Sequence, residues 1–315
     1  MKKSLWVSFA LAPFAKIRFV NCLLPTVMLM ISISLPTLGQ DAEEVIKFDI
    51  SLVTVNVVVK DHKGRALLGL KSEDFLVTDE NTRVSPELFG SEGPASIVFV
   101  VDTSSSMRGD KWKSLNEGLK SFLKKSRVGN DYTLVAFDRS AYVVAESISA
   151  EELLKSLSTL RVGGETALYD GVMLGLQSLR RTRQQNRALV LISDGEDNSS
   201  HTKLADVEEQ AFARRATIYS IGVLLDHYCS IRIAGACNCK ETVKQLATIT
   251  GGMAFFPDAD GLARALKQIS NEVNSQYSLS YYPPNKTTGW RNVQVAVAQP
   301  DSHAKLRYQQ RYLMK

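Results

Sequence analysis

Hydrophobic residues follow two different periods along this chain, and the first is that of a β-strand. Between residues 53 and 59 every odd position is a valine, which predicts a strand within residues 45–60 because successive strand side chains point to opposite faces. Turn residues then separate two further predicted strands at 75–78 and 84–89. Short strands at such close spacing are typical of a small antiparallel sheet.

The pattern changes after a cluster of Gly, Ser and Pro at residues 90–94. Residues 96–101 and 188–193 are continuous apolar runs, which predict strands buried on both faces. Further strands are expected at 132–137, 141–144, 217–223 and 253–256. Apolar residues at helical spacing lie between the strands, in segments 110–123, 153–160, 167–179, 204–216, 242–249 and 262–273. Strands that alternate with helices predict an α/β fold, with a doubly wound, mainly parallel sheet covered on both faces.

Beyond residue 276 the period of two returns, in segments 277–281 and 293–297, and a closing strand is expected at 306–312. Neither flank alone offers much core, because isolated sheets of two or three strands are marginally stable. We therefore expect residues 41–92 and 277–315 to pair into one small β-sandwich, with the α/β domain of residues 93–276 inserted into it. Contacts between residues 53–59 and 293–297 would support this arrangement, and two separate sheets, each built from one flank alone, would exclude it.

The first forty residues have the composition of a targeting segment. They are basic up to Arg18, apolar from 19 to 35 with interruptions at Asn21 and Pro25, and contain small residues near a cleavage position at Gln40. We expect a signal peptide, with an uncleaved N-terminal anchor as the alternative. Either one implies an exported chain that is periplasmic, at the cell surface or secreted.

Charge adds little to this picture. The formal net charge is +5, but residues 1–40 contain Lys2, Lys3, Lys16 and Arg18 and no acidic residue, so the remainder is nearly neutral. Such a balance gives no electrostatic reason to expect binding to nucleic acid or to an anionic membrane surface.

Three short polar segments lie close to the ends of the apolar runs. Asp102, Ser104 and Ser106 follow the first run, Asp194 follows the second, and Thr166 lies between them in the chain. In open α/β sheets, ligands bind beyond the carboxyl ends of the strands, so two carboxylates and three hydroxyls are expected at one rim. Oxygen ligands of this kind suit Mg²⁺ or Mn²⁺. The alternative is structural, because Asp and Ser also cap helices and form turns.

These five residues resemble, in type, order and spacing, the metal-ion-dependent adhesion site of the von Willebrand factor A (vWA) domain, with Asp102, Ser104 and Ser106 matching its Asp-x-Ser-x-Ser signature. The resemblance covers roughly residues 93–276. Residues 69–75 and 277–283 also resemble a bacterial secreted subfamily of this domain, known largely from acidobacterial genomes. The resemblance implies a Rossmann-like fold and a binding module rather than an enzyme. One metal position would stay open for a carboxylate of a protein partner, in adhesion or envelope assembly.

Three cysteines remain after the targeting segment. Cys229, Cys237 and Cys239 lie near His227 in residues 226–240, between a predicted strand and a predicted helix. In an exported chain a disulfide from Cys229 to Cys237 or Cys239 is expected, which leaves one thiol over. Zinc held by His227 and the three cysteines, or free or intermolecular cysteines, are the alternatives.

Enzyme motifs are missing from the sequence. It contains four histidines and no Gly-x-Ser-x-Gly elbow, His-Glu-x-x-His helix or phosphate-binding glycine loop. Two further hypotheses remain beside metal-dependent binding. One is an interaction module that does not need the metal, which would only stabilise its loops; the other is a metal-assisted hydrolase, for which no general base is visible.

Overall fold

The computed structural model describes residues 52–124, 126–182, 184–223, 239–258, 261–298 and 304–314. All of them belong to one compact unit, Asp49–Lys315, and the expected targeting segment lies outside the described residues. Within these ranges, no helix combines the length and the apolar character needed to cross a membrane.

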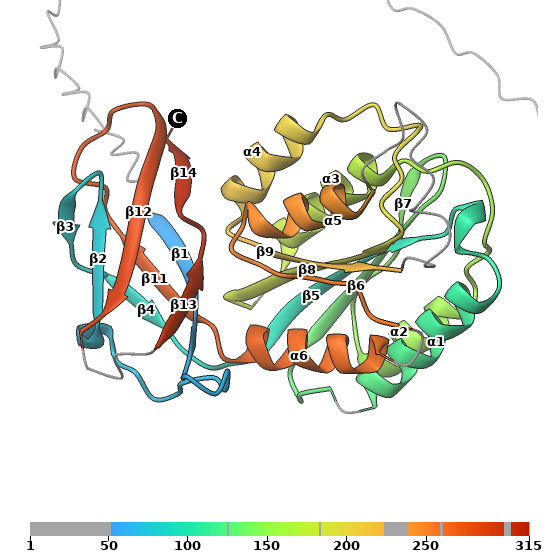
Figure 1. Cartoon of the computed structure of the whole chain (residues 1–315), viewed down its shortest axis with the longest axis horizontal. Helices are drawn as coiled ribbons and strands as arrows, with labels where there is room; N and C mark the ends of the chain where they lie inside the picture. Colours follow the sequence, from blue (N-terminus) through green and yellow to red (C-terminus); the bar gives the residue numbers. More distant parts are fainter. Residues whose placement is uncertain are drawn as a thin grey trace, which may run out of the picture. The chain divides into compact units, whose positions relative to one another are not determined.

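A six-stranded sheet forms the centre of the α/β domain, in the order β10-β9-β8-β5-β6-β7 (Figure 1). The neighbours from β10 to β6 pair in parallel, and only the edge strand β7 runs antiparallel, along β6. The six strands are β5 (Ala95–Asp102), β6 (Asp131–Phe137), β7 (Ala141–Ile148), β8 (Asn186–Ser193), β9 (Thr217–Gly222) and β10 (Ala254–Phe255). The predicted doubly wound, mainly parallel sheet is confirmed.

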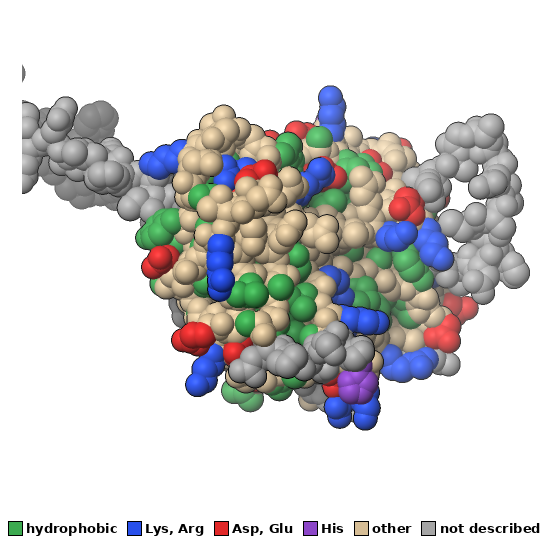
Figure 2. Space-filling view, turned by 60° about the vertical axis from the view of Figure 1, so that its left-hand side comes forward, with side chains coloured by type: hydrophobic (Ala, Val, Ile, Leu, Met, Phe, Trp, Pro, Cys, Tyr) green, Lys and Arg blue, Asp and Glu red, His purple; other side chains and the backbone are tan. Residues whose placement is uncertain are grey.

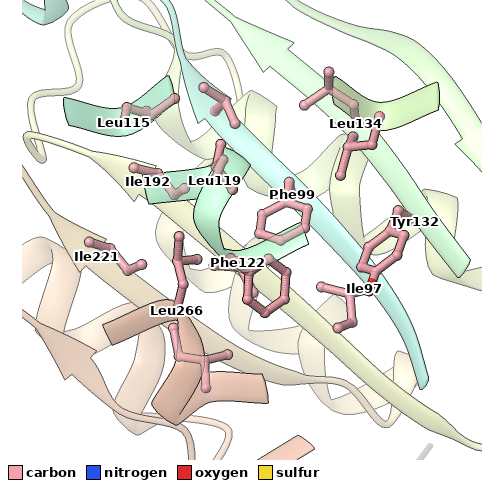
Figure 3. Close-up of a cluster of buried hydrophobic side chains, with 14 of the residues drawn as sticks. Ile97, Phe99, Leu115, Leu119, Phe122, Tyr132, Leu134, Ile192, Ile221 and Leu266 are labelled. Atoms are coloured by element: carbon pink, nitrogen blue, oxygen red, sulfur yellow. The ribbon is translucent and has the colours of Figure 1, made fainter. Parts of the chain in front are cut away.

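Helices cover both faces of this sheet, and successive side chains of β5 point to the two faces in turn. Ile97, Phe99 and Val101 pack with α1, α2 and α6 on one face, whereas Val98 and Val100 pack with α3, α4 and α5 on the other. Figure 3 shows Ile97 and Phe99 beside Phe122 of α1. Every residue of β5 is buried, as a strand between two helical layers requires. The helices are α1 (Asp110–Leu123), α2 (Ala150–Leu157), α3 (Leu168–Ser178), α4 (Leu204–Arg214), α5 (Cys239–Thr248) and α6 (Leu262–Asn274). Short 3₁₀ turns are η1 (Ser72–Asp74), η2 (Ser105–Met107) and η3 (Leu179–Arg181).

The flanking segments form two antiparallel four-stranded sheets, in the orders β13-β1-β11-β4 and β14-β12-β2-β3. Each sheet takes strands from both ends of the chain, since β1 pairs with β11 and β2 pairs with β12. Val55, Val57, Val293 and Val295 share one hydrophobic core, so the predicted β-sandwich is confirmed. Its strands are β1 (Val53–Lys60), β2 (Phe75–Asp79), β3 (Thr82–Val84), β4 (Leu88–Gly90), β11 (Tyr277–Tyr281), β12 (Gly289–Val297), β13 (Lys305–Tyr308) and β14 (Arg311–Met314).

Two strand predictions were wrong in the same way. The segment 84–89 contains the end of β3 and the start of β4, and the segment 306–312 is divided between β13 and β14; in both cases the two strands lie in different sheets. Pro86 interrupts the first segment, because proline cannot donate a ladder hydrogen bond. A period of two along the sequence shows which residues face inward, but it does not show where the chain crosses from one sheet to the other.

The surface carries charges of both signs. In the face drawn in Figure 2, Lys and Arg side chains are interspersed with Asp and Glu and do not gather into one broad patch of either sign. This face therefore shows no extended charged surface for a polyanion.

Candidate metal site at the carboxyl end of the sheet

Neighbouring parallel strands bring the two predicted aspartates to the same rim. Asp102 is the last residue of β5 and Asp194 directly follows β8, and these strands pair in parallel. The Ser193 hydroxyl donates to Oδ2 of Asp102 at 2.6 Å, which ties the end of β8 to the end of β5. The parallel register thus places the two carboxylates as the sequence predicted.

The three loops around these strand ends are joined by hydrogen bonds that involve backbone groups. Ser105 N donates to Gly164 O at 3.1 Å, which connects the loop after β5 to the loop before α3. Thr166 N donates to Oδ1 of Asn198 at 2.8 Å, and Thr166 O accepts from Asn198 N at 2.9 Å. The loop after β8 therefore holds Thr166 in place through two hydrogen bonds with Asn198.

Hydroxyl groups also meet at this rim. The Oγ atoms of Ser104 and Ser106 lie 3.0 Å apart, so residues two positions apart point to one place. Ser104 and Thr166 are buried, with 1% and 2% of their surface exposed, whereas Ser106 is exposed. The rim therefore offers neutral oxygens at different depths, from a closed interior to the solvent.

Asp102 is completely buried, and among the residues that the structure describes no basic side chain hydrogen-bonds to it. Its Oδ1 accepts from Ser104 N at 2.8 Å and its Oδ2 accepts from Ser193. The pKa of Asp102 is raised to about 6, chiefly by burial and also by the nearby Asp194 charge, although the hydrogen bonds from Ser104 and Ser193 lower it. A carboxylate in such a position is stabilised by any cation that enters the site.

Asp194 has one satisfied oxygen and one that is not. Its Oδ2 accepts from Nζ of Lys111 at 2.9 Å, and both side chains are less than a tenth exposed. Its Oδ1 is buried and has no hydrogen-bond partner among the described residues. An orphaned buried carboxylate oxygen needs an explanation, and a metal ion or its bound water is one that fits.

The donor set fits a hard divalent cation. Two carboxylates and up to three hydroxyls are oxygen ligands, the type that Mg²⁺ and Mn²⁺ take in proteins. In the part of the chain that the structure describes, no group of three or more His, Cys, Asp or Glu side chains forms a metal site. A site with two carboxylates does not belong to that class, because its remaining ligands are hydroxyls and water.

Sequence reasoning missed Lys111, and a signal for it was present. Lys111 lies four and eight positions before Leu115 and Leu119, so it belongs to the buried stripe of α1. A lysine in an apolar stripe needs an anionic partner, since an unpaired buried ammonium is costly. The partner could not be identified from the sequence, because Asp194 is 83 residues away in the chain.

The loop that begins at Asp194 depends on one glycine. Gly195 has φ +89°, and a Cβ atom there would lie 2.3 Å from the carbonyl oxygen of Cys239. A side chain at this position would push α5 away from the end of β8. The aspartate therefore precedes a turn that only glycine permits.

Of the predicted cysteine site, only Cys239 is described, at the first position of α5. Cys229, Cys237 and His227 lie outside the described residues. The disulfide therefore stays a prediction, as do its alternatives.

Part of the α/β domain matches a known protein family. Residues 97–196 match the family model of the von Willebrand factor type A domain, a segment that contains all five predicted site residues. The match covers about a third of the chain and supports a von Willebrand factor type A domain in its α/β part.

Individual relatives are distant and much longer. The chain is 27% identical over 247 residues to the calcium-activated chloride channel regulator 1 of Equus caballus, covering 72% of this chain and 25% of that protein. It is 22% identical over 180 residues to the inter-alpha-trypsin inhibitor heavy chain H3 of Bos taurus, covering 47% of this chain and 20% of that protein. The chain thus spans a quarter or less of the length of these two relatives.

Among solved structures, the von Willebrand factor type A protein from Catenulispora acidiphila is similar, with a TM-score of 0.47 and 12% identity. That match covers 85% of this chain and 74% of the other. The finer likeness to an acidobacterial-type subfamily stays a prediction.

Proposed function

We propose that this protein is an exported binding module that holds Mg²⁺ or Mn²⁺ between Asp102 and Asp194 and uses the ion to bind a carboxylate of a protein partner. The observation that carries the proposal is the buried Oδ1 of Asp194, which has no partner in the described part of the chain, beside the buried carboxylate of Asp102. Together these two groups carry two negative charges, and Lys111 supplies one positive charge. A divalent cation would change the net charge of these groups from −1 to +1, which a carboxylate of a partner would then neutralise.

The hydroxyls explain why such an ion would still attract an anion. Ser104, Ser106 and Thr166 are neutral ligands, so they would leave the bound cation with most of its charge. Ser106 is exposed, which places the solvent side of the rim within reach of a partner. Adhesion or assembly at the envelope is the setting that we propose for such binding. No catalytic role is part of the proposal.

The first experiment is thermal unfolding of the exported chain, residues 41–315, in metal-free buffer and with added MgCl₂ or MnCl₂ at constant ionic strength. An ion that binds only the folded state stabilises it by about 2.7 kcal/mol at a hundredfold excess over the dissociation constant. We expect the transition midpoint to rise for the wild type and for Glu151→Gln, which removes one exposed charge elsewhere. Asp194→Asn should abolish the rise. Equal shifts in the wild type and Asp194→Asn would contradict the proposed site.

A separate experiment tests whether the bound metal ion keeps an open coordination position. Water-proton relaxation measures how many waters remain on protein-bound Mn²⁺, and we expect acetate, as a minimal carboxylate, to displace one of them. Chloride at the same ionic strength is the control. Relaxation that acetate leaves unchanged would show a closed coordination shell, which excludes the carboxylate-binding part of the proposal.

One observation favours a second candidate, a module that binds partners without metal. The Lys111 ammonium already lies beside the Asp194 carboxylate, so it neutralises one of the two negative charges at the rim without a metal ion. In that case neither metal nor chelator would change the unfolding midpoint, and partner binding would persist in EDTA.

A further inference from the structure

A second candidate site lies at the opposite end of α3 from the metal site. A cavity of about 730 Å³ opens between β7, α3, η3 and α4. Thr166 lies just before α3, whereas Arg180 and Arg181 follow its last turn, in η3. The 11 residues of α3 separate the two places by about 16 Å, from the rise of an α-helix.

The lining of this cavity combines basic and apolar side chains. Arg180, Arg181 and Arg214 provide three guanidinium groups, and Val143, Met173 and Leu174 provide an apolar wall. Its one carboxylate is Glu146, which pairs with Arg181 at 3.2 Å.

The two remaining arginines have no carboxylate partner among the described residues. Arg214 donates from one terminal nitrogen to Oε1 of Gln210 at 3.1 Å, and its Nε is buried without a hydrogen-bond partner. Burial lowers the pKa of Arg214, and repulsion by the Arg180 charge lowers it further. Two neighbouring cations and a buried unsatisfied donor are costly unless an anion lies between them.

We propose that this cavity binds an oxyanion, a phosphate or carboxylate group attached to an apolar body, with Arg180 and Arg214 on the anion and the apolar wall against the body. Guanidinium groups match such oxygens because they donate two parallel hydrogen bonds. The volume lies within the range of about 300–1,000 Å³ that is common for small-ligand sites. The inference is independent of the metal site, since it uses neither aspartate.

Isothermal titration calorimetry on the exported chain, at low ionic strength and without metal, tests the proposal with defined probes. Phenyl phosphate and phenylacetate carry the two candidate anions on the same apolar ring, and the tighter of them identifies the anion. Inorganic phosphate lacks the ring and benzyl alcohol lacks the charge, so both should bind at least tenfold more weakly than that probe.

Variants connect the binding to the arginines. We expect Arg214→Gln and Arg180→Gln to weaken binding of the tighter probe at least tenfold. Arg180→Lys should fall between wild type and Arg180→Gln, because lysine keeps the charge without the two-pronged donor. Arg83→Gln, which removes an exposed arginine of β3, should leave the affinity unchanged. Arg180 is exposed, so its variants test the site even if Arg214→Gln fails to fold.

Three results would overturn the proposal. They are no binding of either aromatic anion at millimolar concentration, equal binding by wild type and Arg180→Gln, and inorganic phosphate binding as tightly as phenyl phosphate. Failure of the metal experiment would not affect these readouts.

Discussion

Two buried carboxylates, Asp79 in the β-sandwich and Asp194 at the rim of the α/β sheet, are each paired with one basic side chain, but their surroundings differ. Both oxygens of Asp79 are satisfied, because Oδ1 accepts from two nitrogens of Arg291 at 2.8 and 3.0 Å and Oδ2 accepts from the Tyr312 hydroxyl at 2.7 Å. Within the described ranges, Asp194 has one hydrogen bond to its carboxylate, from Lys111, and one buried oxygen without a partner.

This difference separates a structural ion pair from a candidate binding site. A guanidinium bonded through two nitrogens fixes the geometry of its carboxylate and leaves little reason to admit a ligand. A lysine ammonium is a point charge on a flexible stem, so it can neutralise Asp194 and still move aside. An incoming cation would therefore gain more interaction energy at Asp194 than at Asp79.

The largest loss of unfolding free energy is expected for a variant in the β-sandwich. Arg291→Met would leave Asp79 buried and unpaired, which costs about 3–5 kcal/mol of unfolding free energy. Urea unfolding followed by fluorescence measures this loss, and Arg83→Met in the same sheet is the matched control. The double variant Asp79→Leu with Arg291→Met should recover much of the stability, because apolar replacement of a buried pair is tolerated. Equal midpoints for Arg291→Met and Arg83→Met would show that the pair is not structural.

A smaller loss is expected at the rim, together with a gain in metal binding. Lys111→Met should cost the metal-free protein about 1–3 kcal/mol, the contribution of one charged hydrogen bond. Metal affinity should rise at least about tenfold, since a unit charge about 4 Å from a divalent ion repels it by about 2–8 kcal/mol. Titration of Mn²⁺ measures the affinity, with Lys113→Met, an exposed position of the same helix, as control. If Lys111→Met bound metal no more tightly than Lys113→Met, the ammonium would not compete with the ion.

The smallest effect on stability is expected for Asp102→Asn. It removes a buried charge that no basic side chain contacts, so the metal-free unfolding free energy should stay within about 1 kcal/mol of wild type or rise. The amide can still accept from Ser104 N, and the Ser193 hydroxyl can turn to accept from it.

Denaturant unfolding with and without MnCl₂ separates the two roles of Asp102. Its asparagine variant should keep metal-free stability and lose the metal response, whereas Asp194→Asn should lose both because it also weakens the bond to Lys111. A normal metal response in Asp102→Asn would remove Asp102 from the proposed ligand set.

The sequence by itself determined the alternation of buried strands and amphipathic helices, and it also placed polar groups at the ends of β5 and β8. Both are local properties: the apolar run Ser96–Val101 predicts a buried strand whatever surrounds it, and Asp102 follows that run directly. The strands of the sandwich could likewise be predicted from their period of two, although the points at which the chain changes sheets could not.

Only the tertiary structure decided which charges meet. Lys111 and Asp194 lie 83 residues apart, Asp79 and Arg291 lie 212 apart, and Arg180 and Arg214 come from different helical segments. A periodic pattern shows that a residue is buried, but a charge pair depends on where two elements pack, which is a long-range property of the fold. For that reason the aspartates of the candidate metal site could be predicted, whereas their lysine and the arginine-lined cavity could not.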